Sequence, residues 1–164
     1  MSLGITQRVL HRIAFFMPGG YSARPYLHKL RGVKIGKDVW ISLFVYIDEI
    51  HPEAVTIGNN SSIGIRSSII THFYWGPKNT HQRIGKIHIG ENVFIGPHCV
   101  ILPNVQIGNG SVVQAGSIVT RNVAPHTFIG PPKPEPLATI TVPLTHNSSY
   151  LSFIKGLRPI DKKH

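Results

Sequence analysis

Histidine is the side chain in this 164-residue sequence best suited to proton transfer, and the chain has ten of them. An imidazole with an ordinary pKa of about 6.5 can accept a proton near neutral pH. Such general-base help is typically worth about 10²–10⁴ in rate when a poor nucleophile such as a hydroxyl attacks. His72 ends a regular aliphatic segment and precedes an irregular one. A base there would be held by a rigid element beside a loop, so we expect His72 to be catalytic rather than a structural turn histidine.

His81 and Asp48 are the secondary candidates. His81 lies inside the irregular segment and is expected to contact the substrate or to replace His72 as the base. His98 occupies a turn position and is expected to be exposed. Only seven residues are acidic, and Asp48 with its neighbour Glu49 precedes His72 by one structural repeat. A base usually has an orienting partner, so we expect Asp48 to orient His72 or bind the substrate; the alternative is a solvated turn carboxylate.

A six-residue repeat surrounds these candidates. A β-branched aliphatic residue recurs every six positions, with one four-residue slip and one longer interruption, at Ile35, Ile41, Ile47, Ile57, Ile63, Ile69, Ile89, Ile95, Ile101, Ile107, Val113 and Val119. A small or slim residue usually follows four positions later. This period is neither the 3.6 of a helix nor the alternation of a half-exposed strand. It predicts short strands joined by tight turns that contain glycine, asparagine or aspartate.

Three such strands return the chain to its starting side, which predicts an all-β stack of triangular coils. Four coils are expected, at residues 35–52, 57–74, 89–106 and 107–124, stacked in parallel about 4.8 Å apart. The aliphatic residues should point inward, and Cys99 falls on a small inward position, where it fills space rather than reacts. The end coils should need caps over their unpaired backbone. A conventional β-sandwich would not space its strands by six.

A family resemblance is carried by two stretches, IGENVFIGPHCVILPNVQIGNGSVVQAGSIVTRNVAPHTFIG and VYIDEIHPEAVTIGNNSSIGIRSSIITH. Over about residues 33–142 the chain resembles the hexapeptide-repeat acetyltransferases, in particular the maltose, galactoside and nodulation-factor O-acetyltransferase group. The resemblance implies a left-handed parallel β-helix, against the usual right-handed crossover preference. It also implies a homotrimer with active sites between subunits. The implied activity is direct transfer of an acetyl group from acetyl-CoA to a hydroxyl of a sugar or saccharide intermediate, with His72 as base and no metal.

The same resemblance implies where acetyl-CoA binds. Its narrow pantetheine arm should follow small residues and backbone groups, and its phosphates should meet a cation through charge-assisted hydrogen bonds. The corresponding residues are Gly96, Pro97, Ala115, Thr120 and Arg121, with Lys133 as a further cation. After Gly130 the stretch PPKPEPLAT departs from the family's usual ending.

Three other functions are compatible with parts of the sequence. A zinc enzyme resembling the γ-class carbonic anhydrases would need convergent ligands, but Leu102 or Pro103 stands where its second histidine would be. A non-catalytic trimeric scaffold or binding protein would keep the repeat without needing His72. Transfer to the nitrogen of an amino sugar would use the same base, and no residue separates that acceptor from a hydroxyl.

The flanks predict the remaining organisation. A helical flank at 1–32 should precede the β-helix at 33–130, which has a loop insertion at 75–88 and is followed by an extension at 131–164. Residues 5–17 form an amphipathic pattern that should pack its apolar residues on the first coil or a neighbouring subunit; alternatively, this basic helix lies on anionic lipid. A second helix is expected near 25–31 and a strand at 138–142.

Composition narrows the partners. Seventeen Lys and Arg against seven Asp and Glu give a net charge of +10, which favours anionic partners such as a phosphate-bearing cofactor. No nucleic-acid-binding motif is present, so nucleic acid is not an expected partner. A single cysteine cannot form an internal disulfide, which favours a reducing cytoplasm. The apolar run at 13–17 is too short for a secretion signal.

Overall fold

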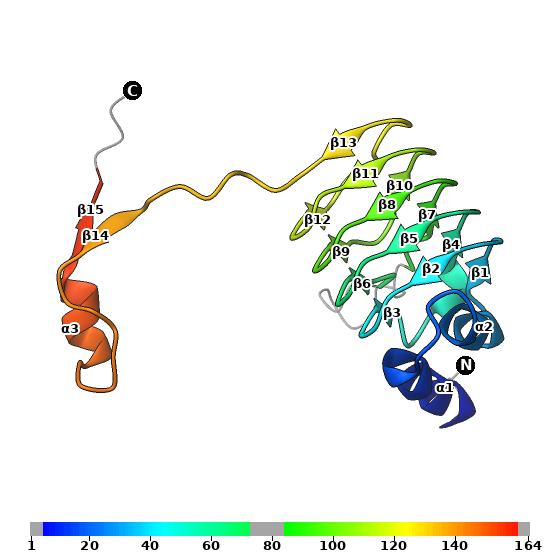
Figure 1. Ribbon diagram of the computed structural model, residues 1–164, viewed down its shortest axis with the longest axis horizontal. Helices are drawn as coiled ribbons and strands as arrows, with labels where there is room; N and C mark the ends of the chain where they lie inside the picture. The colour runs from blue at the N-terminus through cyan, green and yellow to red at the C-terminus, as the bar shows by residue number, and fades with distance from the viewer. Residues whose placement is uncertain (1–4, 73–83, 161–164) are drawn as a thin grey trace, which may run out of the picture. The chain divides into compact units, whose positions relative to one another are not determined.

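The computed structural model describes residues 5–72 and 84–160, except the side chain of Ile5 (Figure 1). The chain forms two compact units, Met1–Pro131 and Pro132–His164. The first unit contains the repeats. The second pairs β14 (Ala138–Ile140) with β15 (Leu157–Pro159) in antiparallel fashion, and α3 (Tyr150–Lys155) lies between them in sequence. None of the helices in these described ranges is long and apolar enough to cross a bilayer.

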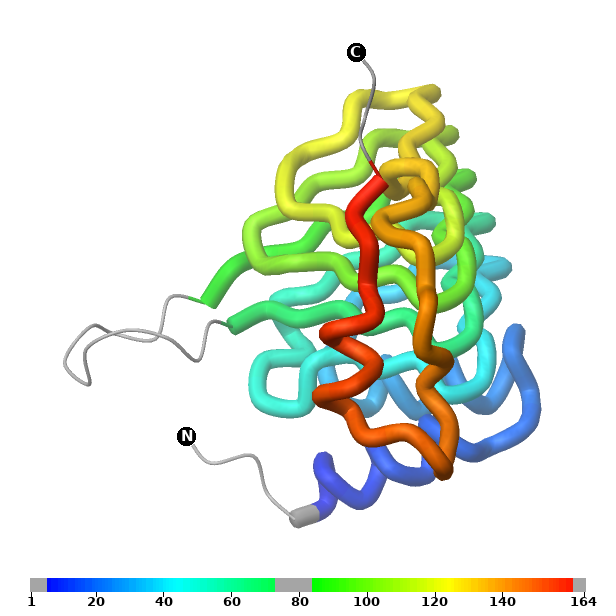
Figure 2. Tube along the Cα trace, turned by 90° about the vertical axis from the view of Figure 1, so that its left-hand side faces the viewer, coloured from blue at the N-terminus to red at the C-terminus, as the bar shows by residue number. Residues whose placement is uncertain are grey.

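The first unit winds as a stack of coils (Figure 2). Its strands form three parallel sheets; each of the first four turns adds one strand to each sheet, and the last turn adds β13 to one sheet only. Sheet A contains β1 (Lys34–Ile35), β4 (Val55–Ile57), β7 (Ile87–Ile89) and β10 (Gln106–Ile107). Sheet B contains β2 (Trp40–Ile41), β5 (Ser62–Ile63), β8 (Phe94–Ile95), β11 (Val112–Val113) and β13 (Phe128–Ile129). Sheet C contains β3 (Tyr46–Ile47), β6 (Ser68–Ile69), β9 (Val100–Ile101) and β12 (Ile118–Val119).

The sequence repeat and the pairing register coincide. In sheet A, Ile35 pairs with Ile57, Ile57 with Ile89 and Ile89 with Ile107. The repeated aliphatic residues are buried, apart from the half-buried Ile35 in the first coil. The predicted parallel stacking and inward-pointing ladder are therefore confirmed.

The small inward positions fill the same core. Cys99 is fully buried, as expected for a space-filling residue. The Ser61 hydroxyl donates to the Gly90 carbonyl at 2.8 Å and accepts from the Val93 N–H at 3.0 Å. A buried hydroxyl is costly only when it lacks partners, so this serine bridges two coils without penalty.

A further strand follows the four expected coils: β13 pairs with β11, inside the β-helix expected at 33–130. One boundary differs from the sequence expectation. The strand β7 already begins at Ile87, so the last two residues of the predicted 75–88 insertion belong to the coil. The difference arises because pairing with the neighbouring strand, rather than local sequence, decides where so short a strand begins.

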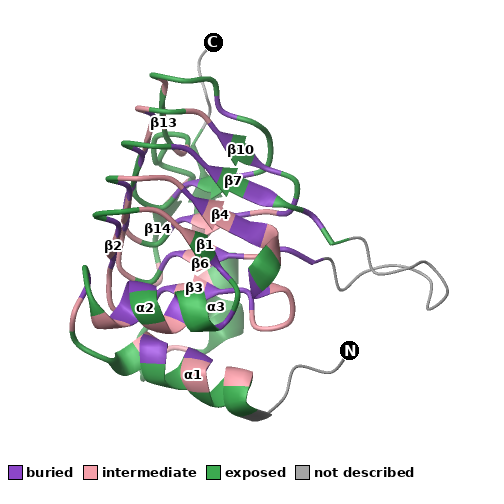
Figure 3. Ribbon diagram, turned by 90° about the vertical axis from the view of Figure 1, so that its right-hand side faces the viewer, coloured by how far each residue is buried: buried purple, intermediate pink, exposed green. Residues whose placement is uncertain are grey.

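Two helices, α1 (Ile5–Phe16) and α2 (Ala23–Leu30), lie against the first coil. The apolar residues of the first helix do not pack on the first coil, which was one of the placements expected for them; contact with a neighbouring subunit or with lipid stays a prediction. Val9, Ile13 and Phe16 are 48%, 43% and 67% exposed, whereas His11 and Ala14 are buried. Figure 3 shows both buried and exposed segments along α1. Backbone hydrogen bonds hold this flank to the open edge of the coil: the Phe44 N–H donates to the Phe15 carbonyl, and the Ile41 N–H donates to the Gly20 carbonyl, both at 3.0 Å.

Replacing Ile89 by alanine should test the ladder. The fully buried side chain lies on a central strand of sheet A, and Ile→Ala in a close-packed core costs about 2–5 kcal/mol. Denaturant unfolding should show that loss. The control is His88→Ala, an exposed neighbour on the same strand, which should change stability by no more than about 0.5 kcal/mol. Equal losses in the two variants would contradict the inward placement of the ladder.

Candidate functional site

A buried carboxylate–imidazole pair lies where two neighbouring strands of sheet C end. Asp48 directly follows β3, and His72 follows β6 by three residues, while Ile47 and Ile69 are in register. The parallel strands therefore deliver both side chains to the same edge of the sheet. His72 Nδ1 lies 2.6 Å from Asp48 Oδ2, and the two residues are 3% and 0% exposed.

Four hydrogen bonds surround the Asp48 carboxylate. Oδ1 accepts from the backbone N–H groups of Ile50 at 2.8 Å and His51 at 3.1 Å, and Oδ2 accepts from the Thr71 N–H at 2.7 Å as well as from His72. Burial alone would raise the pKa of Asp48, but the hydrogen bonds from Thr71, His51 and Ile50 outweigh it and lower the pKa. Asp48 is thus a buried carboxylate at neutral pH, and the reading of it as a solvated turn residue is wrong.

The carboxylate determines the tautomer of the neutral imidazole. An ionised Asp48 can only accept, so Nδ1 of His72 carries the proton and the basic lone pair is on Nε2. This arrangement holds the ring in one orientation with Nε2 as the nitrogen able to take a proton. The geometry matches a general base with an orienting partner.

Residues 84 and 85 contact the end of this strand segment. His72 forms an antiparallel bridge with Ile84, and the Gly85 N–H donates to the Thr71 carbonyl at 2.7 Å. A Cβ on Gly85 would collide with the Pro103–Asn104 backbone, so only glycine fits between these coils. The candidate His81 lies outside the described residues.

The predicted acetyl-CoA residues fall at two edges of sheet C and in the second unit. Gly96, Pro97 and Ala115 share the corner where sheet B turns into sheet C, because Ile95 and Val113 are in register. A Cβ on Gly96 would lie 2.6 Å from the Ala115 backbone nitrogen, so this corner has no room for a side chain at position 96. Thr120 and Arg121 are exposed and directly follow β12. They therefore lie at the other edge of sheet C, where His72 follows β6.

Lys133 and His98 are two further residues with an expectation from the sequence. Lys133 is exposed and belongs to the second unit. His98 is exposed at a corner with φ of 56°, as expected. Within the described ranges, no three His, Cys, Asp or Glu residues gather in a way that could hold a metal ion.

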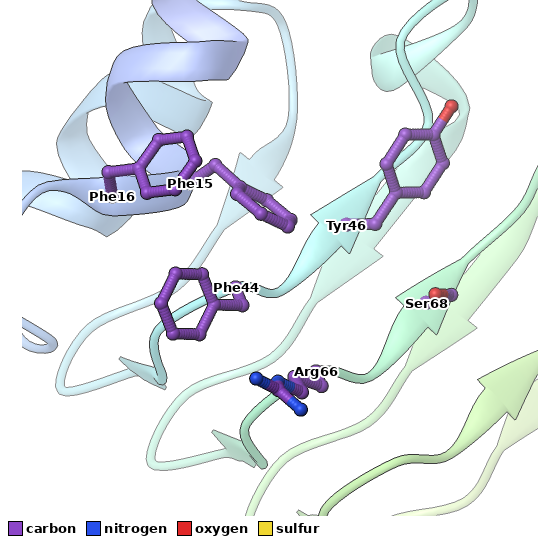
Figure 4. A pocket seen from close by; sticks show the side chains of 6 residues that line it. All are labelled: Phe15, Phe16, Phe44, Tyr46, Arg66 and Ser68. Carbon is purple, nitrogen blue, oxygen red and sulfur yellow. The ribbon is translucent and has the colours of Figure 1, made fainter. Parts of the chain in front are cut away.

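Sequence reasoning missed an aromatic pocket beside α1. Its volume is about 510 Å³, and its lining residues are Phe15, Phe16, Phe44, Tyr46, Arg66 and Ser68 (Figure 4). The Arg66 guanidinium lies 5.7 Å from the centre of the Phe44 ring, close enough for a cation–π contact. Both residues adopt left-handed φ, 58° and 59°, which bulky side chains seldom do. The spacing carried a signal that was not used: Phe44 precedes Arg66 by the same offset that puts Ile41 in register with Ile63.

Arg31 is a second residue that sequence reasoning missed. Its guanidinium is buried and donates to the backbone carbonyls of Ile47 at 3.0 Å and Asp48 at 2.7 Å. The available signal was the spacing of Arg24, His28 and Arg31, which places three polar side chains on one face of a helix.

Known sequences agree with the predicted family resemblance. Residues 86–121 match the family model described as "Bacterial transferase hexapeptide (six repeats)". A Bacillus subtilis (strain 168) protein named "Putative acetyltransferase YvoF" is 40% identical over 99 residues, which are 60% of this chain and 55% of that protein. The chain spans about half the length of the curated relatives it matches.

Solved structures support the fold. The hexapeptide-repeat acetyltransferase VCA0836 of Vibrio cholerae, a complex with acetyl-CoA, superposes with a TM-score of 0.64 at 22% identity, covering 78% of this chain and 81% of the other. A galactoside acetyltransferase in complex with coenzyme A gives a TM-score of 0.57 at 25% identity, covering 76% and 74%. The resemblance inferred from the repeats is therefore confirmed by sequence and by fold.

The hydrogen bonds to Asp48 predict a pH-dependent contribution to stability. Because its folded-state pKa is lowered, the contribution is complete above the unfolded value of about 3.9 and is lost as pH falls through the folded value. Asp48→Asn should cost about 1.5–3 kcal/mol at pH 7, and its gap to wild type should narrow below about pH 4. Urea unfolding over a pH series measures both.

The matched control is Asp38→Asn. Asp38 is an exposed turn carboxylate with φ of 53°, a conformation that asparagine tolerates. The Asp38→Asn substitution should leave the free energy of unfolding nearly unchanged at every pH. If the stability difference between wild type and Asp48→Asn stays constant down to pH 3, the ionised state assigned to Asp48 is contradicted.

Proposed function

We propose that this protein is an acyltransferase that moves an acetyl group from acetyl-CoA to a hydroxyl of a sugar or saccharide intermediate. The observation that carries the proposal is the 2.6 Å contact between Asp48 and His72 in a buried position at the edge of sheet C. The names of the matched relatives and structures point to the same chemistry. The acetyl donor is a substrate and is released as coenzyme A.

The reaction needs one base that later acts as an acid. Nε2 of His72 takes the proton of the acceptor hydroxyl while the hydroxyl oxygen attacks the thioester carbonyl. The tetrahedral intermediate collapses, the carbon–sulfur bond breaks, and the imidazolium returns its proton to the departing sulfur. Asp48 stays ionised throughout and stabilises the imidazolium through Nδ1–H, as a carboxylate does in a hydrolytic triad. No acyl-enzyme intermediate forms, so donor and acceptor are bound together.

The donor is placed along sheet C. In this proposal Gly96, Pro97 and Ala115 let the pantetheine arm approach the backbone at this corner, while Thr120 and Arg121 supply donors to the phosphates. The coils wind left-handed, and a homotrimer in the cytoplasm provides the second wall of each site from a neighbouring subunit. Support comes from the acetyl-CoA and coenzyme A complexes among the similar structures.

Loss of the base is the direct test. His72→Ala should lower turnover by at least about 100-fold, measured as coenzyme A release against a panel of sugars, nucleotide sugars and amino sugars. Acetyl-CoA affinity, measured by calorimetry, should be unchanged because His72 serves the acceptor. His88→Ala, on the exposed side of sheet A, is the matched control and should keep wild-type turnover. Near-normal turnover in His72→Ala would reject the assignment.

We also propose that α1 rests on an anionic membrane surface, near an acceptor linked to lipid. Support comes from its orientation: Val9, Ile13 and Phe16 face outward, the basic Arg8 and Arg12 are exposed, and the helix contains no acidic residue. An interfacial helix has this combination of an apolar face and flanking cations. The contact of Arg8 with Glu49, 3.8 Å and largely exposed, is too weak to hold that cation away from lipid.

Vesicle co-sedimentation tests the membrane contact. The protein should bind vesicles that contain phosphatidylglycerol, should not bind pure phosphatidylcholine, and should be released by salt. Ile13→Ser combined with Phe16→Ser should abolish binding, whereas Phe128→Ser, which alters an equally exposed ring at the last coil, should not. If the double variant instead changes only the oligomeric state, the face is a subunit contact and the membrane proposal fails.

A further inference from the structure

The first coil has an unpaired side that must be capped. Both β2 and β3 are edge strands, each bonded to a neighbouring strand on one side only. The carbonyls of Ile41 and Ile47 therefore have no strand to accept from on the outer side, and a buried carbonyl without a donor is costly. The cap has to come from outside the repeat.

Two buried arginines of the N-terminal flank provide these donors. Arg24 donates from Nε to the Ile41 carbonyl at 2.6 Å and from a terminal nitrogen to the Met17 carbonyl at 2.7 Å. Arg31 donates from one terminal nitrogen to both Ile47 and Asp48. The two arginines are 4% and 1% exposed. They are thus equivalent caps on adjacent sides of the coil.

A neutral histidine orients the second arginine. His28 is fully buried, and Nδ1 lies 2.9 Å from the other terminal nitrogen of Arg31. Burial, and then the Arg31 charge, lower the pKa of His28 to about 3, so its Nδ1 accepts from the guanidinium. Burial lowers the pKa of Arg31 to about 10, which still leaves it a cation at neutral pH. One terminal nitrogen of the planar guanidinium is therefore bonded to His28, and the other is bonded to the backbone at the end of β3.

The two caps differ in what lies beyond them. Arg24 holds the end of β2, which leads into a corner. Arg31 holds the carbonyl of Asp48 itself, and the carboxylate of that residue contacts His72. A shift of the Asp48 backbone would move its carboxylate relative to the ring, which is the kind of misplacement that costs rate.

We propose that Arg31, oriented by His28, is a positioning residue that holds Asp48 where its carboxylate can orient His72. This inference rests on the proposed function for its catalytic consequence, but its structural part does not. The contacts run from α2 through Arg31 to the end of β3, and from Asp48 to the end of β6. The N-terminal flank is thereby part of the site as well as a cap.

The test compares Arg31→Met with Arg24→Met, because each removes one buried arginine cap from the first coil. Both should lower the unfolding temperature. Only Arg31→Met should lower kcat, by about 10- to 100-fold per folded molecule, with the KM for acetyl-CoA unchanged. Arg31→Lys keeps the positive charge but lacks the planar guanidinium with its several N–H donors. Its kcat should lie between those of Arg31→Met and wild type.

A second readout is independent of catalysis. The Nδ1–H of His72, bonded to a buried carboxylate, should give a downfield proton resonance by NMR, assigned by its loss in Asp48→Asn. That resonance should weaken or disappear in Arg31→Met and persist in Arg24→Met. If Arg31→Met does not fold, Arg31→Lys decides: a wild-type resonance and a wild-type kcat overturn the proposal.

The outcomes separate the two proposals. If wild-type protein transfers acetyl to no acceptor while the resonance still depends on Arg31, the function fails and the positioning role stands. If transfer occurs and depends on His72 but Arg31→Met and Arg24→Met affect kcat and the resonance equally, the positioning role fails and the function stands.

Discussion

Hydrogen bonding between coils is the interaction on which this molecule depends. A strand of two residues has too few bonds to be stable alone, and each strand here persists because a strand of the next coil pairs with it in register. The inward ladder of β-branched side chains adds the apolar burial. Pairing of this kind always leaves an edge, so the ends of the stack need a different solution from its middle.

The N-terminal flank meets that requirement with charge rather than with apolar packing. Arg24 and Arg31 turn inward, where unpaired carbonyls require donors. On α1 the inward places are taken by His11 and Ala14, while Val9, Ile13 and Phe16 are exposed. Burial lowers the pKa of His11 to about 4, so it packs as a neutral ring edge-on against Tyr46, with ring centroids 5.1 Å apart. The open edge of the first coil therefore explains the buried cations.

The Asp48–His72 pair arises where the same ladder is interrupted. Regular coils turn every side chain either into the core or into solvent, and neither environment suits a base with a charged partner. At the end of β3 the four-residue slip allows Asp48 to turn inward and accept from the Ile50 and His51 N–H groups. Beyond the end of β6, His72 forms an antiparallel bridge with Ile84 instead of continuing the parallel ladder. The two irregularities lie on adjacent coils, so the rigid repeat holds two otherwise unrelated side chains in contact.

The repeat, its register and the inward positions were determined by sequence alone, because a six-residue period of β-branched residues leaves each strand only one way to bury its side chains. His72 and Asp48 could be selected as candidates from their positions relative to that period. Tertiary structure decided the remaining features. They are the contact between Asp48 and His72, the role of Arg31, the orientation of α1, the pocket around Phe44 and the strand at Phe128–Ile129. The physical reason is that these features depend on which segments meet after the coils have stacked, and for Arg31 on which carbonyls are then left without a strand partner. Both are properties of the assembled ladder rather than of any local segment.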